Sequence, residues 1–290
     1  MELLAVVLAL AAALSFAGAF VAQQHAAAGV PDGQGEGLRL YLRLARSPMW
    51  WAGALGDAAG FVLQAVALVF GSVVLVQPVL VTALIFALPL AARWNGRRVS
   101  RGDLCWAAVV VAGLAVFTVL ADSTKESVSD AARPWIWPGA ACVVACVGLF
   151  AAGWRTKGTV RAVAFGALAG MAYGIVAPLT ELVMASLERT GPVGVLRSWP
   201  VYALLVWALA GTAWQQTAFH AGNLGASLPT TQVLEPVVAV GLGLWALGAR
   251  LGTHGPAWLA LGLAAAAMVV GTVRLARGAA QEGAPSPAGQ

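Results

Sequence analysis

Three observations predict an all-α, polytopic membrane protein. The 290 residues are 60% hydrophobic and only 10% charged, with a mean hydropathy of +0.82, values that water-soluble globular domains of this size do not show. Apolar runs of about 18 residues or more recur along the chain, and each can cross roughly 30 Å of hydrocarbon. The 34 glycines suit close helix packing in lipid. The chain is therefore expected to lie in a lipid bilayer.

Nine apolar runs predict nine membrane-spanning helices. They cover residues 3–22, 49–70, 72–92, 104–121, 135–153, 162–187, 199–219, 224–249 and 256–276. The first run has no basic residue before it, unlike the leader of a cleaved signal peptide, so it is counted as a helix. The second and third runs are nearly contiguous, which predicts a tight hairpin.

Lys and Arg residues are divided unequally between the two sides that nine spans define. Five lie on the side of the N-terminus and twelve on the other side. Short cytoplasmic loops carry an excess of these residues. The sequence therefore predicts an external N-terminus and a cytoplasmic C-terminus in the plasma or inner membrane. The net charge of +5 is explained by these loops, so nucleic acid is not an expected partner.

The two halves of the chain resemble each other weakly. The matching positions are Gln64 with Gln216, Gln77–Pro78 with Glu235–Pro236, and Trp106 with Trp258. Five spans separate the start of one copy from the start of the other, so the copies enter the membrane from opposite sides. The pattern predicts a 4+1+4 inverted repeat, an architecture used for alternating access. The expected units are a first four-helix repeat (1–121), a connector with the fifth helix (122–161), a second repeat (162–276) and a disordered cytoplasmic tail (277–290).

Glu235 lies near the middle of the eighth apolar run. A carboxylate near the bilayer centre costs about 2.5 to 3.5 kcal/mol on insertion scales, so such groups usually face a bundle interior or a water-filled cavity. Pro236 follows and leaves the carbonyl one turn earlier without its usual partner. Glu235 is expected to bind a cation, carry a proton or pair with a cationic substrate. The alternative is a protonated carboxyl that serves packing only.

Other polar residues inside the apolar runs complete the predicted substrate site. The candidates are Glu235, Gln64, Gln77, Gln232, Thr231, Asp57 and Gln216. Thr231 and Gln232 share the helix face of Glu235. Asp57 either lines the cytoplasmic entrance or pairs with a loop arginine such as Arg97. The glutamines either bind a polar cargo or join helices.

Prolines in the third, sixth and eighth runs predict kinks that let the two halves move. These residues are Pro78, Pro178 and Pro236. The sequence contains no HExxH, GxSxG or phosphate-loop motif, so neither enzyme chemistry nor a cofactor is expected. A metal ion, if one binds, is expected at Glu235. The expected partners are a small-molecule or ion substrate and the bilayer. The sequence leaves open whether the protein forms a homodimer.

Several stretches resemble a known family of transporters. They are SPMWWAG (47–53), ALVFGSVVLVQPVLVTALIFALPLAA (67–92), RRVSRGDLCWAAVVVAGLAVFTV (97–119) and QQTAFHAGNLGASLPTTQVLEPVVA (215–239). The chain resembles the drug/metabolite transporter superfamily, above all its NIPA-like magnesium transporter branch and bacterial members of the superfamily. The resemblance implies an EamA-like fold and transport of a small polar or cationic solute by alternating access. The branch implies magnesium or another divalent cation as an alternative cargo.

The chain departs from the NIPA-like pattern at acidic positions. Phe61 and Gln64 stand where the branch carries glutamate and asparagine, and Arg97 and Ala249 stand where it carries acids. Magnesium needs hard oxygen ligands and commonly one or two carboxylates. The departures therefore weaken the magnesium hypothesis. A non-transporting membrane scaffold, whose polar residues only join helices, is the alternative of another class.

Overall fold

The computed structural model describes residues 2–31, 38–70, 76, 79–94, 96, 99–121, 136–222, 224–246 and 257–282. All regular secondary structure in these ranges is helical. The helices are α1 (Glu2–Ala28), α2 (Leu38–Leu44), α3 (Pro48–Phe70), α5 (Ala83–Trp94), α6 (Arg101–Ala121), α7 (Ile136–Arg155), α8 (Gly158–Arg197), α9 (Trp199–Ala221), α10 (Leu224–Ala246) and α11 (Ala257–Glu282). The all-α prediction is confirmed for the described residues.

Several of these helices are compatible with insertion into a membrane. By length and composition, three can each cross a bilayer, namely Leu3–Ala28, Gly158–Thr180 and Leu259–Gly278. The pair Arg189–Arg197 and Trp199–Ala221, bent by 64°, can count as a fourth. Val79–Trp94 and Gly139–Arg155 are shorter apolar helices. The structure thus supports a membrane protein with several apolar helices.

Helix boundaries follow the predicted runs closely, with four differences. α8 continues to Arg197, past the predicted end at residue 187. α1 continues to Ala28, past the predicted end at residue 22, because polar residues of its last turns find partners inside the bundle. The short helix α2 lies in a segment for which no helix was expected. α11 extends to Glu282, so the disorder predicted for 277–290 is wrong for its first six residues. Small and long-chain residues there favour a helix.

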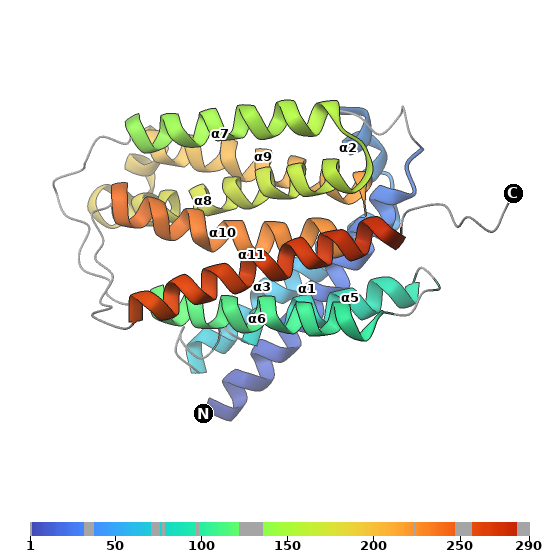
Figure 1. Cartoon of the computed structure of the whole chain (residues 1–290). Coiled ribbons are helices and arrows are strands. Elements are labelled where there is room, and N and C mark those ends of the chain that lie inside the picture. Colours follow the sequence, from blue (N-terminus) through green and yellow to red (C-terminus); the bar gives the residue numbers. More distant parts are fainter. Residues whose placement is uncertain are drawn as a thin grey trace, which may run out of the picture.

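Helices α6 to α11 lie roughly side by side along one direction, α1 and α3 are inclined to them, and α2 lies at one end of the bundle (Figure 1). α1 packs on α3 and α5, and α5 packs on α6. In the same order, α8 packs on α9 and α10, and α10 packs on α11. α6 and α11 contact each other, while α7 lies at one edge against α8 (Figure 1). The two sets of four helices therefore share one packing order.

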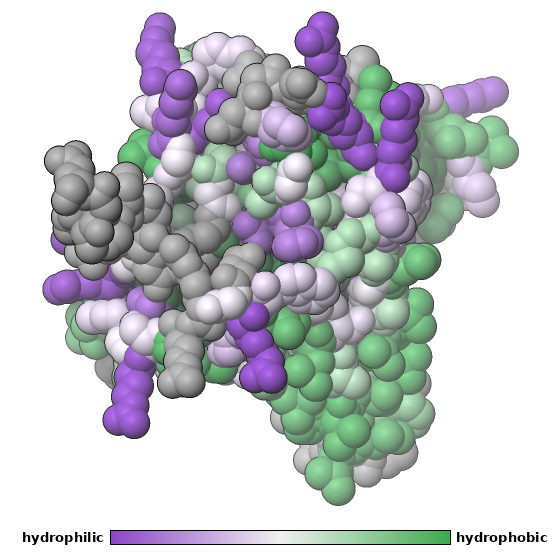
Figure 2. Space-filling model, turned by 90° about the vertical axis from the view of Figure 1, so that its right-hand side faces the viewer, coloured by the Kyte–Doolittle hydropathy of each residue, from purple (hydrophilic) through white to green (hydrophobic). Residues whose placement is uncertain are grey.

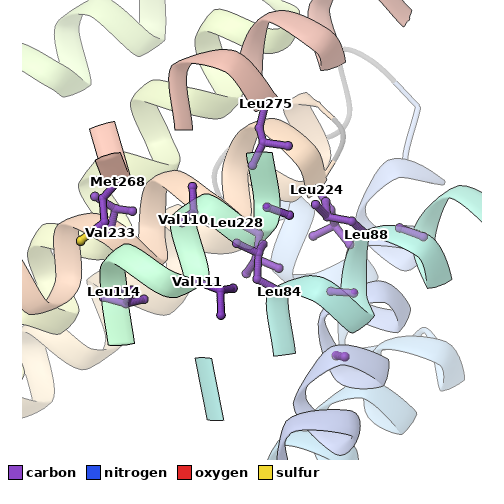
Figure 3. Close-up of a cluster of buried hydrophobic side chains, with 14 of the residues drawn as sticks. Leu84, Leu88, Val110, Val111, Leu114, Leu224, Leu228, Val233, Met268 and Leu275 are labelled. Carbon is purple, nitrogen blue, oxygen red and sulfur yellow. The ribbon is translucent and has the colours of Figure 1, made fainter. Parts of the chain in front are cut away.

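A core of aliphatic side chains forms where α5, α6, α10 and α11 meet. Figure 3 shows Leu84 and Leu88 of α5, Val110, Val111 and Leu114 of α6, Leu224, Leu228 and Val233 of α10, and Met268 and Leu275 of α11 around this junction. These are the third and fourth helices of each set. The junction therefore joins the two halves of the chain.

α8 and α10 approach each other closely along a row of glycines. A Cβ atom on Gly166, Gly170 or Gly174 would lie 2.8, 2.7 or 2.6 Å from the carbonyl oxygens of Ser227, Thr231 and Glu235, respectively. The three glycines recur every fourth residue and face three α10 residues with the same spacing. Only glycine leaves room for the α10 backbone at this distance.

Two of the three prolines predicted to kink their helices lie inside continuous helices. α8 and α10 remain helical through Pro178 and Pro236. The interruption of α8 lies at Gly191, where φ is +69° and ψ is −179°. A glycine adopts this conformation without the steric cost that a Cβ brings. Pro78 lies outside the described residues.

Hydrophilic side chains gather at the end of the bundle where α2 lies. Figure 2 looks at this end and shows long hydrophilic side chains projecting around it, with hydrophobic side chains beside them. Helix ends with basic residues meet here, including the end of α7 at Arg155 and the start of α8 after Lys157 (Figure 1). This is the end that the sequence predicts to face the cytoplasm.

We predict that Gly170→Ala destabilises the fold, because the added methyl group collides with the backbone of α10. Overpacking of this kind costs about 1 to 3 kcal/mol, and thermal unfolding in detergent measures it. The matched control is Gly148→Ala in α7, where the glycine is exposed and an added Cβ meets no atom within 4 Å. An equal melting temperature for Gly170→Ala and the wild type would contradict the close approach.

Candidate functional site

A chain of polar side chains connects α3, α1 and α9. Nε2 of Gln23 donates a hydrogen bond to Oδ2 of Asp57 at 2.6 Å. Nε2 of Gln216 donates to Oε1 of Gln23, also at 2.6 Å. Gln23 and Gln216 are buried and Asp57 is half-buried. The chain brings Asp57 and Gln216, two of the predicted site residues, into one network, and Gln23 is the residue that joins them.

Tyr173 of α8 forms the second part of the site. Its hydroxyl donates to Oε1 of Gln215 at 2.7 Å and contacts the hydroxyl of Thr212 at 3.4 Å, both on α9. Gly174, the next residue on α8, lies against the backbone of Glu235 on α10. α8 therefore carries Tyr173 between hydrogen-bonding partners on α9 and the part of α10 that holds Glu235.

Glu235 lies deep in the bundle, but its side chain is still partly accessible. It stands eleven residues after Leu224, the start of α10, about 16 Å along the helix. α10 packs against α1, α5, α6, α7, α8, α9 and α11, and protein atoms surround the Glu235 carboxyl group. The side chain is nevertheless only half-buried. Within the described residues it forms no hydrogen bond or ion pair. A central carboxyl group is thus left free to interact with a solute.

Thr231 and Gln232, predicted to assist Glu235, have different surroundings. The hydroxyl of Thr231 donates to the carbonyl oxygen of Gly166 at 2.9 Å and to that of Ser227 at 3.1 Å. Thr231 is buried, and its hydroxyl joins α10 to α8. Gln232 is half-buried, and its carbonyl oxygen lacks the usual helical donor because Pro236 has no N–H.

The remaining predicted residues are spread more widely. Gln64 is half-buried on α3, two turns after Asp57, and takes no part in the hydrogen bonds that join Asp57 to Gln216. Gln77 lies outside the described residues. Within the described residues the partner of Asp57 is Gln23. Arg97, the loop arginine predicted to pair with Asp57, lies outside the described residues.

Sequence reasoning missed Gln23 and Tyr173. Gln23 and Gln24 extend an apolar run into its last turns, and two adjacent amides there are a signal that they are paired inside the bundle. Gln24 donates to the carbonyl oxygen of Gly222 at 3.3 Å. Tyr173 carried no such signal, because a tyrosine in a membrane helix commonly lies at the interface.

α2 closes the region from the end of the bundle. The hydroxyl of Tyr41 donates to the carbonyl oxygen of Ala213 at 2.5 Å and contacts Thr217 at 3.4 Å, both on α9. Burial raises the pKa of Tyr41, so the neutral phenol stays available as the donor. His220, one turn further along α9, contacts the carbonyl oxygen of Ala27 through Nδ1 at 2.8 Å. Both contacts hold α9 in position beside Gln23.

The chemistry of the site is that of carboxyl, amide and phenol groups. Among the described residues no three His, Cys, Asp or Glu side chains cluster so that they could hold a metal ion. Cys142 and Cys146 are free thiols on α7. The groups around Asp57, Tyr173 and Glu235 can accept and donate hydrogen bonds and attract a positive charge.

Comparison with known proteins gives one informative match. No protein-family model matches the sequence, and no solved structure matches it. An uncharacterized protein of Corynebacterium glutamicum is 35% identical over 277 residues, which cover 95% of this chain and 96% of that protein. Agreement over nearly the whole of both chains means that the two share one architecture. The chain therefore belongs to the same family as this uncharacterized corynebacterial protein.

Proposed function

We propose that the protein is a secondary membrane transporter of the drug/metabolite type, which moves a small polar or cationic solute by alternating access. The observation that carries this proposal is Glu235, a carboxyl group at the centre of the helix bundle that is half-buried and without a hydrogen-bonding partner in the described residues. Burying a carboxyl group there is costly unless a partner compensates it. A solute that visits the site supplies that partner.

The arrangement of the helices supports two inverted halves. α1, α3, α5 and α6 pack in the same order as α8, α9, α10 and α11. α1 ends at the α2 end of the bundle, where α8 begins (Figure 1). We propose that these sets are the two halves of a 4+1+4 inverted repeat of nine spans, with α7 as the connector. Repeats of this kind place the substrate near the midplane between the halves.

The polar region is built from both proposed halves. Asp57 and Gln23 come from the first set, and Gln216, Tyr173 and Glu235 from the second. A relative motion of the two halves must therefore change the site itself. Gly191, with its left-handed conformation after the long apolar part of α8, offers a point at which the second half can bend.

We predict that Glu235→Gln lowers solute flux in proteoliposomes at least tenfold, because the amide cannot attract or exchange a cation or proton. Flux of candidate solutes, magnesium among them, is measured for both proteins. The control is Asp103→Asn at the start of α6, a carboxylate that accepts a hydrogen bond from Ser100 at 2.7 Å outside the site. Unchanged flux in Glu235→Gln would remove Glu235 from the mechanism, and no flux of any solute in the wild type would oppose transport.

We predict further that water reaches Glu235, in contrast to the interior of a purely structural scaffold. On a background in which Cys105, Cys142 and Cys146 are serine, Glu235→Cys should react with a membrane-impermeant thiol reagent. Leu228→Cys, on the same helix at a position with 0% exposure, is the unreactive reference. Equal and negligible labelling at both positions from either side of the membrane would favour the scaffold hypothesis.

A further inference from the structure

Asp57 determines which atoms of the Gln23 and Gln216 amide groups donate and which accept hydrogen bonds. A carboxylate only accepts hydrogen bonds, so Gln23 must meet Asp57 with its nitrogen. Gln23 then presents its oxygen to Gln216, which must donate from its own nitrogen. Each amide orientation follows from the one before. The Oε1 atom of Gln216 is consequently left at the end of the chain as an acceptor.

This acceptor is buried and unpaired. Gln216 is 1% exposed, and its Oε1 atom has no hydrogen-bond partner among the described residues. An unpaired buried acceptor costs about 1 to 3 kcal/mol, and native proteins keep few of them. Turning the amide round does not help, because Gln23 would then face an oxygen with its own oxygen. Within the described residues no donor reaches this oxygen, so a donor that enters the region can satisfy it.

The charge around the acceptor is negative. Asp57 lies two hydrogen bonds away from it along the chain, and Glu235 lies on α10, which packs against α9, the helix that carries Gln216. Within the described residues, neither carboxyl group forms an ion pair with Lys or Arg. Buried charges are normally paired. The donor that satisfies Gln216 is therefore favoured to carry a positive charge.

We propose that Asp57, Gln23 and Gln216 form a binding subsite for a cation with N–H donors, of which a protonated primary amine is the simplest. The ammonium group donates to Oε1 of Gln216 and neutralises the carboxylate of Asp57. Gln23 forms hydrogen bonds with Asp57 and with Gln216 and positions these two side chains. Magnesium prefers six oxygen ligands, whereas these three side chains offer one carboxylate and one free amide oxygen. The inference rests on the proposed transport of a polar or cationic solute and narrows that solute to an amine.

The test compares cations of equal charge with and without N–H groups. Methylammonium, butylammonium and benzylammonium are titrated against the purified full-length protein, each beside its N,N,N-trimethyl counterpart at constant ionic strength. Binding is read as a saturable rise in the unfolding temperature and confirmed by calorimetric titration. We expect at least one amine to bind at least tenfold more tightly than its trimethyl counterpart, which carries the same charge but cannot donate.

Variants assign the selectivity to the subsite. Gln216→Leu should remove the preference for N–H donors. Asp57→Asn can still accept a hydrogen bond from Gln23, but it should weaken the binding of all the cations at least tenfold. Gln24→Leu is the matched control, because Gln24 is a neighbouring buried amide that bonds only to the backbone of Gly222. If Gln216→Leu does not fold, the cation affinity of Asp57→Asn alone tests the subsite.

The outcomes separate this inference from transport itself. Equal binding of the amines and their trimethyl counterparts, or no binding of any amine, would overturn the subsite and would mean that water alone satisfies Gln216. Transport of another solute together with either result would leave the proposed function standing. Selective amine binding without flux in proteoliposomes would sustain the subsite and overturn transport.

Discussion

The close contact between α8 and α10 determines how the rest of the site is built. Gly166, Gly170 and Gly174 let the α10 backbone approach where its carbonyl oxygens at Ser227, Thr231 and Glu235 would collide with any Cβ atom. The contact holds α10 in the centre of the bundle, where it packs against seven other helices. A carboxyl group on that helix cannot escape to the membrane surface. The position of Glu235 is thus a consequence of backbone packing, and its chemistry follows from that position.

The polar groups in the interior are organised by hydrogen-bond direction as much as by charge. Asp57 orients Gln23, and Gln23 orients Gln216, so one carboxylate decides the polarity of two buried amides on different helices. Tyr173 of α8 bonds to Gln215 of α9, and the next residue, Gly174, lies against the backbone of Glu235. Residues that are far apart in the sequence are thus joined through α8 and α9.

Apolar runs predicted the positions of most helices to within a few residues, as for α3 and α9, because burial in lipid leaves a direct compositional signal. The run pattern did not predict α2 or the length of α11, since both depend on helix-forming residues outside the apolar runs. Glu235, Asp57 and Gln216 could be named as site residues because polar groups in apolar runs are costly. Gln23 and Tyr173 could not be named, because pairing depends on which helices meet. The break at Gly191, directly before Pro192, lies beyond the predicted end of its apolar run.

The central claim is that Asp57 of the first half and Glu235 of the second half belong to one polar site. A double-mutant cycle tests it most directly, with Asp57→Asn, Glu235→Gln and the combined variant compared by their free energies of unfolding in detergent. Two carboxylates that share one site repel each other, so that either substitution should relieve this repulsion. We therefore predict a coupling energy of about 0.5 kcal/mol or more, with the double variant gaining less than the sum of the single effects. Additivity to within about 0.3 kcal/mol would show that the two acids are independent and would contradict a shared site.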